Sequence, residues 1–182
     1  MTDLPTAKTV LDFWFSAGPK KWFSKDDAFD DDIARQFSAL HEVAVKGQID
    51  EWSSTPAGAL ALIIVLDQFS RNLHRNSPLA FATDDKALGL SQSLIDARQD
   101  IEFPADVRQW IYMPFMHAEG LAMQQRSVDL FTTTGNEENL KFAIVHLDII
   151  KQFGRFPHRN NVLGRTSSTE ELEFLASGGF AG

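Results

Sequence analysis

The chain has 182 residues, with 17 Lys and Arg, 25 Asp and Glu, a net charge of −8 and no cysteine. The absence of cysteine excludes disulfide scaffolds, thiolate zinc sites, iron–sulfur clusters and cysteine nucleophiles. A net acidic chain is unsuited to general nucleic-acid binding, which needs a basic face to replace the counterions of the phosphates. We therefore expect no nucleic-acid partner, although a local basic site is compatible with this total charge.

No targeting or membrane segment stands out in the sequence. Residues 1–8 lack the basic start and the long apolar stretch of a signal peptide. The longest apolar run, residues 59–66, is far shorter than the ~20 residues that cross a bilayer. These features predict a soluble, cytoplasmic protein with no membrane partner.

The clearest predicted helix covers residues 27–46. Its apolar residues recur at steps of four, four, three and four, which is the spacing of one buried helical face. An acidic run fills the first turn, where the helix dipole favours negative charge, and Gly47 follows the helix end. We interpret the acidic run as a solvated first turn rather than a metal site. The predicted buried face consists of Phe29, Ile33, Phe37, Leu40 and Ala44.

The rest of the chain is also predicted to be helical. Ser54-Thr55-Pro56 is typical of a helix cap with an opening proline, and the segment that follows is apolar on almost every side. Pro114 is expected to end or kink a helix that Pro104 opens, because proline lacks a backbone donor. No sustained alternation of period two occurs, so we predict an all-α fold. The other helices are predicted at residues 56–69, 78–98, 115–131 and 140–153, and from a capping-box pattern at 167–171, before a fraying tail at 178–182.

An internal repeat organises the chain. Residues 68–79 and 152–163 share seven identities in twelve positions without a gap. Each copy follows an apolar helix and precedes another predicted helix, which indicates duplication of a larger helical unit. We therefore predict a tetratricopeptide-like stack of helix pairs with two-fold internal duplication. The two halves are expected at about residues 27–98 and 113–176 of a single domain that spans residues 1–182.

These two repeated loops concentrate side chains that bind anions. An arginine presents a planar fork of donors that matches a carboxylate or a phosphate, while histidine titrates near neutrality and asparagine adds an amide donor. The candidate ligand-binding residues are Arg71, His74, Arg75, Arg155, His158, Arg159 and Asn160. A second interpretation stays open. The arginines would then bind helix-terminal carbonyls and acids of the other repeat, and so form a structural clasp.

A second candidate group contains His117 and Glu119. On one helix these two residues would point about 200° apart, so they cannot form the pair of a helical metal site. We expect no metal. His117 is expected to hydrogen-bond within the core or to line a cleft, with catalysis as the alternative, and His146 is expected in the core. Asp67 ends an apolar run and needs a partner, for which Arg71, four residues later, is the obvious local choice.

Four motifs occur in order along the chain. They are VLDFWF at 10–15, LDQFSRN at 66–72, PFMHAE at 114–119 and FGRFPHRN at 153–160. Together they resemble the bacterial "domain of unknown function 924" family over about residues 10–175. The resemblance implies a tetratricopeptide-like all-α fold and carries no established activity. The chain departs from the family at Ser70, where members tend to have Pro, and at Ala118, where they tend to have Ser, which weakens any mechanism that needs a hydroxyl beside His117.

The first functional hypothesis is a binding module. Concave surfaces of stacked helix pairs commonly bind ligands. The ligand would be a small anionic molecule or an acidic peptide terminus, with Arg75, Arg155 and Arg159 as donors and Asn160 setting its orientation. No cofactor is expected, and the sequence leaves the oligomeric state open.

Two other hypotheses belong to different classes. One is an enzyme that acts on a phosphorylated or carboxylated small molecule, with His117, Glu119 and His158 as the catalytic candidates and a histidine as general acid or base. The other is a structural or oligomeric scaffold whose loops only clasp the two halves together.

Overall fold

A computed structural model of the chain describes residues 4–180, and every regular element among them is helical. The predicted all-α fold is therefore confirmed for this part of the chain. No helix within it is both long enough and apolar enough to cross a membrane. The chain forms two compact units. Unit 1 comprises the chain up to Arg75 with Leu79–Glu102, and unit 2 comprises Asn76–Pro78 with the chain from Phe103 onward.

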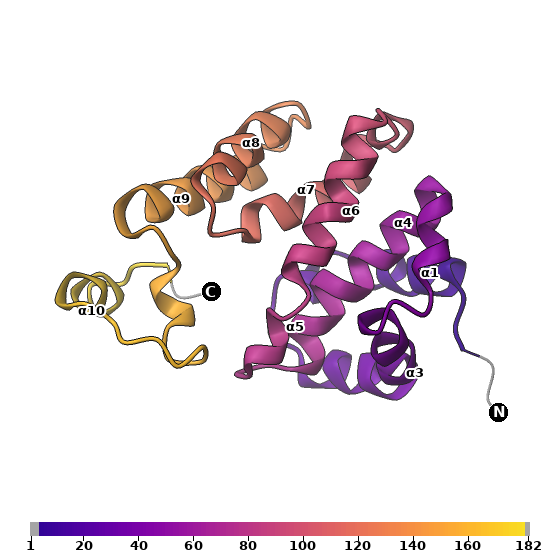
Figure 1. Cartoon of the computed structure of the whole chain (residues 1–182), viewed down its shortest axis with the longest axis horizontal. Coiled ribbons are helices and arrows are strands. Elements are labelled where there is room, and N and C mark those ends of the chain that lie inside the picture. Colours follow the sequence, from indigo (N-terminus) through magenta and orange to yellow (C-terminus); the bar gives the residue numbers. More distant parts are fainter. Residues whose placement is uncertain (1–3, 181–182) are drawn as a thin grey trace. The chain divides into compact units, whose positions relative to one another are not determined.

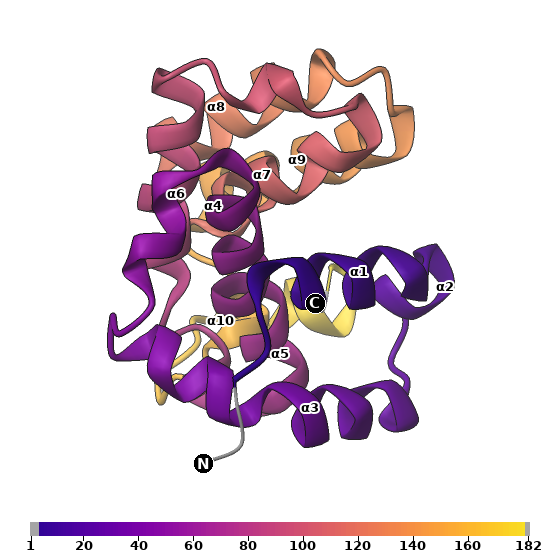
Figure 2. The ribbon, with the colours of Figure 1, turned by 90° about the vertical axis from the view of Figure 1, so that its right-hand side faces the viewer.

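Unit 1 is built around one continuous helical run. Its elements, with the turn η3 that starts at the boundary between the units, are α1 (Ala7–Ala17), α2 (Pro19–Trp22), α3 (Asp27–Val45), η1 (Asp50–Ser54), α4 (Pro56–Ile63), η2 (Ile64–Phe69), α5 (Ser70–Leu73), η3 (Pro78–Ala80), α6 (Asp84–Asp96) and η4 (Asp100–Glu102). The run consists of α4, the π-helical η2 and α5, and α1, α3 and α6 all contact it (Figure 2). The predicted core helix at 56–69 is confirmed, and the run continues to Leu73.

Helix α3 confirms the clearest prediction from the sequence. All five residues of its predicted apolar face are buried. The side chain of Asp26 accepts a hydrogen bond from the backbone N–H of Phe29 at 3.1 Å and so caps the helix. Gly47 follows with φ of +75°, a conformation that glycine adopts without a steric penalty. The ring centroid of Phe37 lies 4.9 Å from that of Phe13 and 4.9 Å from that of Phe69. These contacts tie α3 to α1 and to the central run.

Helix α6 begins later than the sequence predicts. Residues 78–80 form only the short turn η3, and the helix starts at Asp84 instead of residue 78. The hydroxyl of Thr83, the residue before α6, donates to the carbonyl oxygen of Leu66 at 2.5 Å. Thr83 is thereby held against the buried central run, which fixes where α6 can start.

Unit 2 contains the second set of helices. Its elements are α7 (Ala105–His117), α8 (Leu121–Thr132), α9 (Glu137–Phe153), η5 (Pro157–Arg159) and α10 (Thr169–Ala176). Helices α8 and α9 lie side by side, and both contact α7 (Figure 1). The amide of Asn139 on α9 donates to the side-chain oxygen of Gln109 on α7 at 2.9 Å, and the rings of Tyr112 and Phe131 lie 5.9 Å apart. These contacts hold the three helices of unit 2 together.

The helix predicted at 115–131 is helical over most of its length but is not continuous, because the chain leaves the helix at Ala118 and re-enters it at Leu121. Helix α7 continues through Pro114 and ends at His117. The side-chain amide of Gln124, on α8, then donates to carbonyl oxygens at the end of α7, at 2.7 Å for Met116 and 2.6 Å for Ala118. Because this buried amide satisfies acceptors that a continuing helix would have used, the break is stable.

The C-terminal end of unit 2 is partly as predicted. Ser168 and Glu171 form the expected capping box at the start of α10. The expectation of a fraying tail is wrong for Phe180, because its ring packs 4.6 Å from the ring of His146, measured between centroids. Residues 181–182 of the predicted tail lie outside the described residues.

Candidate functional site

The two repeated loops have similar sequences but different backbone conformations. In unit 1 the helix continues past Ser70, so Arg71 lies within α5. In unit 2 the residue at the matching position is Gly154, which has φ of +70° and ends α9. Arg155 therefore follows the end of a helix, in the geometry of a glycine C-cap.

In unit 1, Arg71 binds two carboxylates. Its Nη1 donates to Oδ1 of Asp67 at 3.0 Å and to the backbone oxygen of Asp67 at 2.7 Å. Its Nη1 and Nη2 also donate to the two carboxylate oxygens of Asp84 at 2.9 Å and 3.0 Å. Asp67 is fully buried, and the predicted pairing with Arg71 is confirmed. This arginine holds the central run of unit 1 to the start of α6.

The other arginine of this loop, Arg75, pairs with the acidic start of α3. Its Nε and Nη2 both donate to the carboxylate of Asp30, and the amide of Asn72 donates to the same carboxylate at 2.7 Å. Burial would raise the pKa of Asp30, but the hydrogen bonds from Arg75 and Asn72 outweigh it and lower the pKa. Part of the acidic run thus has a structural partner in addition to its place at a helix N-terminus.

In unit 2, Arg155 forms a two-pronged contact with Glu171. Its Nε and Nη2 donate to the two carboxylate oxygens at 2.6 Å and 2.8 Å. The Glu171 side chain is 3% exposed and also accepts from the backbone N–H of Ser168 at 2.7 Å and from the amide of Asn160 at 3.1 Å. The hydrogen bond from Arg155 is the main reason that the pKa of Glu171 is lowered to about 2.

A second ion pair of unit 2 joins Arg165 to Glu119. Nη1 and Nη2 of Arg165 donate to the two carboxylate oxygens at 2.7 Å and 2.9 Å, and the backbone N–H of Phe156 donates to Glu119 at 2.8 Å. Nε of Arg165 donates to the side-chain oxygen of Asn160 at 2.9 Å. Because Asn160 also donates to Glu171, one hydrogen-bonded network links both ion pairs. Arg165 and Glu171 are not among the candidate residues predicted from the sequence, because their partners lie far away along the chain.

Beside this network lies a group of side chains that we call the histidine cluster. It consists of His117, His146, His158, Arg159, Phe156 and Phe180. The ring centroid of Phe156 is 5.3 Å from that of His146 and 5.6 Å from that of His158. The guanidinium carbon of Arg159 lies 4.6 Å from the centroid of the same phenyl ring. Phe156 is fully buried and serves as the common surface on which these polar groups pack.

Burial and neighbouring positive charge keep two of the imidazoles neutral. Burial is the largest cause that lowers the pKa of His158 to about 4, and the charges of Arg159, Arg165 and His117 lower it further, while Glu119 opposes them. Burial likewise lowers the pKa of His146 to about 4, although its ring nitrogen Nδ1 contacts the backbone oxygen of Phe142 at 2.8 Å.

The ring nitrogen Nδ1 of His158 is buried and has no hydrogen-bond partner among the described residues. A buried polar atom in this state is uncommon in folded proteins.

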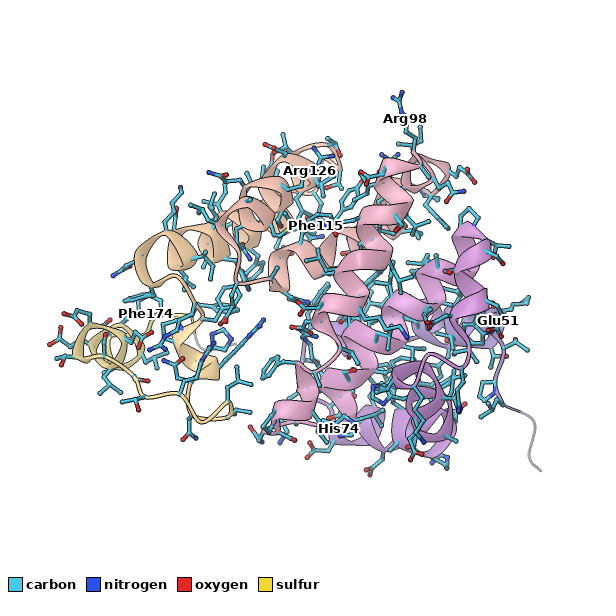
Figure 3. All side chains as sticks on the ribbon, viewed as in Figure 1. Glu51, His74, Arg98, Phe115, Arg126 and Phe174 are labelled. Carbon is cyan, nitrogen blue, oxygen red and sulfur yellow. The ribbon has the colours of Figure 1, made fainter. Side chains whose placement is uncertain are left out.

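The candidate residues of the sequence analysis fall into both units. Arg71, His74 and Arg75 belong to unit 1, and His74 lies at the end of α5, where Figure 3 labels it. His117, Glu119, Arg155, His158, Arg159 and Asn160 belong to unit 2. Because α7 ends at His117, the premise that His117 and Glu119 share one helix is wrong. Within the described part of the chain, no group of three histidine or acidic side chains is placed to hold a metal ion.

Comparison with known proteins gives a family and one solved structure. Residues 10–179 match the model of a bacterial protein family of unknown function, DUF924. A protein of unknown function from Agrobacterium tumefaciens, ATU0120, has a solved structure that is similar to this one, with a TM-score of 0.90 and 40% sequence identity. The match covers 94% of this chain and 97% of that chain. No curated protein matches the chain.

Proposed function

The chain belongs to the DUF924 family of bacterial proteins of unknown function, and we propose that it binds a small anionic ligand at the histidine cluster of unit 2. The ligand is a small anionic molecule or the carboxylate terminus of a peptide. His158 and His117 contact it, and Arg159 contributes positive charge from its place on the ring of Phe156.

The observation that carries this proposal is the unpartnered, buried Nδ1 of His158 in a positively charged setting. Arg159, Arg165 and His117 all lower the pKa of His158, against the opposing charge of Glu119. An anion reverses that effect, because it is attracted to the same groups and favours protonation of the imidazole. His158 would then donate a charge-assisted hydrogen bond to the ligand.

We assign a supporting role to the arginines that already bind carboxylates. Arg71, Arg75 and Arg155 each form at least two hydrogen bonds with acids of their own unit. Asn160, fully buried, bridges Glu171 and Arg165. Arg155 and Asn160 position the unit 2 loop that presents His158 and Arg159 to the ligand, whereas Arg71 and Arg75 hold the matching loop of unit 1.

The same ion pairs favour a second candidate function, that of a structural scaffold. If the loops only clasp the helices, every loop arginine is expected to have a carboxylate partner, and the contacts of Arg71, Arg75 and Arg155 agree with this expectation. The two candidates differ at His158, which forms no such clasp. They are therefore separable by experiment.

Catalysis has weaker support than binding. Glu119 is held by Arg165 and by a backbone N–H, and although burial opposes them, these bonds lower its pKa, so it carries no proton to give near neutral pH. With a pKa of about 4, His158 is also unprotonated there and is a weak base. A catalytic acid–base pair would need pKa values closer to the pH at which the protein works.

For the fold, we propose a tetratricopeptide-like arrangement with an internal duplication. The side-by-side packing of α8 and α9, which are 12 and 17 residues long, supports a helix pair as the building unit. The seven identities between the two loops support the duplication. The different backbones at Ser70 and Gly154 mean that any two copies have diverged locally.

Calorimetric titration with inorganic phosphate and with succinate tests the proposed binding. The wild-type protein is expected to bind at least one of these anions saturably. His158→Phe keeps a ring against Phe156 and is expected to weaken binding about tenfold or more, a loss of about 1.4 kcal/mol. His74→Phe, in unit 1, is the matched control and is expected to change the affinity less than about twofold.

Two results would contradict the binding proposal. One is that neither anion binds the wild-type protein. The other is that His158→Phe and His74→Phe weaken binding equally. In the first case the scaffold function would be the better account.

A further inference from the structure

Unit 1 contains a pocket that the proposed anion site does not use. Its volume is about 390 Å³, which falls within the range of small-molecule sites. It lies between the C-terminal half of α3 and the segment that joins α5 to α6. Its lining residues are His41, Glu42, Val45, Lys46, His74, Leu79, Ala82 and Thr83.

The walls of this pocket are mainly apolar. Val45, Leu79 and Ala82 supply aliphatic surface, and the first two are 46% and 55% exposed, which is unusual for large apolar side chains. Glu42 and Lys46 bring one charge of each sign. Because these charges balance, the pocket selects neither for an anion nor for a cation, and a neutral molecule suits it best.

The polar floor of the pocket is formed by His41, which is 5% exposed. Its ring nitrogen Nε2 lies 2.7 Å from the hydroxyl of Ser70. That hydroxyl is also 2.8 Å from the hydroxyl of Thr83 and 2.7 Å from the carbonyl oxygen of Leu66, which Thr83 contacts as well at 2.5 Å. Four short polar contacts therefore converge within a buried group of four residues.

The number of protons available in this group determines the tautomer of His41. The hydroxyls of Ser70 and Thr83 have one proton each, and the carbonyl of Leu66 has none. Two protons can make only two of the four contacts into hydrogen bonds. A proton on Nε2 of His41 makes a third contact into a hydrogen bond, which His41 donates to Ser70. This tautomer therefore leaves fewer pairs of buried oxygen and nitrogen atoms that face each other with no proton between them.

With its proton on Nε2, neutral His41 has a lone pair on Nδ1. No described residue donates a hydrogen bond to Nδ1, whereas the network occupies the opposite side of the ring. The neutral state agrees with the burial of the ring, which lowers the pKa of His41 to about 4, an effect to which His74 adds. The ring of His74 lies 5.3 Å away, at 57° to that of His41, and forms an adjacent wall.

We propose that this pocket binds a small, neutral, mostly apolar molecule that carries one hydrogen-bond donor, such as a hydroxyl group on a ring, and that Nδ1 of His41 accepts the bond. Val45, Leu79 and Ala82 contact the apolar part of the ligand. The site is independent of the proposed anion site, because all its residues belong to unit 1.

Phenol and toluene are the matched probes, since they have similar size and only phenol has a donor. Backbone amide NMR of the labelled full chain, titrated with each probe, is expected to show saturable shifts around Val45 and Ala82 with phenol. Toluene is expected to bind about tenfold more weakly than phenol. The His41→Phe variant is expected to bind phenol only as weakly as the wild-type protein binds toluene. Equal affinity of the two probes, or no saturable shift with phenol, would overturn the proposal.

A second variant guards against loss of folding in His41→Phe. Ala82 is exposed, so Ala82→Phe fills the pocket from its rim without entering the core. It is expected to abolish the phenol shifts while the circular dichroism spectrum stays that of the wild type, and Ala82→Ser is expected to bind phenol normally. Unchanged phenol binding by a folded Ala82→Phe protein would show that phenol binds elsewhere and would overturn the proposal.

Discussion

The loop at residues 68–79 and the loop at residues 152–163 reach the same chemical result by different routes. In the first, Arg71 stays inside a helix and binds acids four and thirteen residues away. In the second, Gly154 ends the helix, and Arg155 binds Glu171, sixteen residues further along. The similar sequences thus each place an arginine against a carboxylate of the same unit. The backbone conformation differs at one matched position, which is Ser70 in the first loop and Gly154 in the second.

Removing a carboxylate partner from each loop should give the largest difference in the free energy of unfolding between the two loops. Arg71 has two acidic partners, whereas Glu171 alone receives Arg155, Asn160 and the N–H of Ser168. Glu171→Ala leaves those donors unsatisfied, and we expect a loss of about 3 kcal/mol in the free energy of unfolding measured with urea. Asp84→Ala leaves Asp67 beside Arg71 and should cost about 1 kcal/mol. Equal costs for the two variants would break the contrast between the loops.

The two units should share a dependence of stability on pH. His41 in unit 1 and His146 in unit 2 both have a folded pKa of about 4, against 6.5 for the ordinary group. Between these values the unfolded chain binds more protons than the folded chain, so stability falls as the pH decreases from 6.5 toward 4 and is unaffected by these groups above 6.5. From pH 6.5 to 5 we expect a loss on the order of 2 kcal/mol for each histidine.

Urea unfolding at pH 7.5, 6.5 and 5.0 measures this effect. His146→Gln removes one titrating group and should make the decrease between pH 6.5 and 5.0 smaller. Stability that stays constant, or that rises on acidification, would contradict the assignment of neutral buried imidazoles.

A smaller change in the free energy of unfolding should come from Gly154, the position at which the backbone conformation of the two loops differs. Gly154 has a left-handed φ, and a Cβ added there meets no atom within 4 Å, so Gly154→Ala tests backbone strain alone. We expect it to lower the free energy of unfolding by about 1 kcal/mol. Gly89, which is exposed within α6 and also has open space around it, is the matched control. Gly89→Ala should stabilise the protein by about 0.5–1 kcal/mol, because alanine is the better helix former. Changes of the same sign at both positions would count against this explanation.

The sequence predicts the elements whose causes are local. The face of α3, the cap at Thr55 before Pro56, the capping box at Ser168 and the pair Asp67–Arg71 all depend on residues within a few positions of each other. In each case the spacing alone brings the partners together.

Features that depend on distant partners escape this reasoning. The break after His117 is stabilised by a side chain of the following helix, Gln124, and an unbroken helical pattern gives no sign of it. Arg165 and Glu119 are 46 residues apart, and His41 and Ser70 are 29 residues apart. His41 is not among the residues of the predicted apolar face, and neither its network nor its pocket could be inferred from the sequence.

Imidazole NMR of the wild-type protein tests the central claim most directly. The claim is that the loop arginines hold carboxylates of their own unit and leave the histidine cluster to bind an anion. The pKa of His158 would be measured from its ring C–H signal with and without inorganic phosphate, with His41 of unit 1 as the internal control. We predict that phosphate raises the pKa of His158 by about one unit and leaves that of His41 unchanged. An unchanged pKa of His158, or an equal rise at His41, would contradict the account.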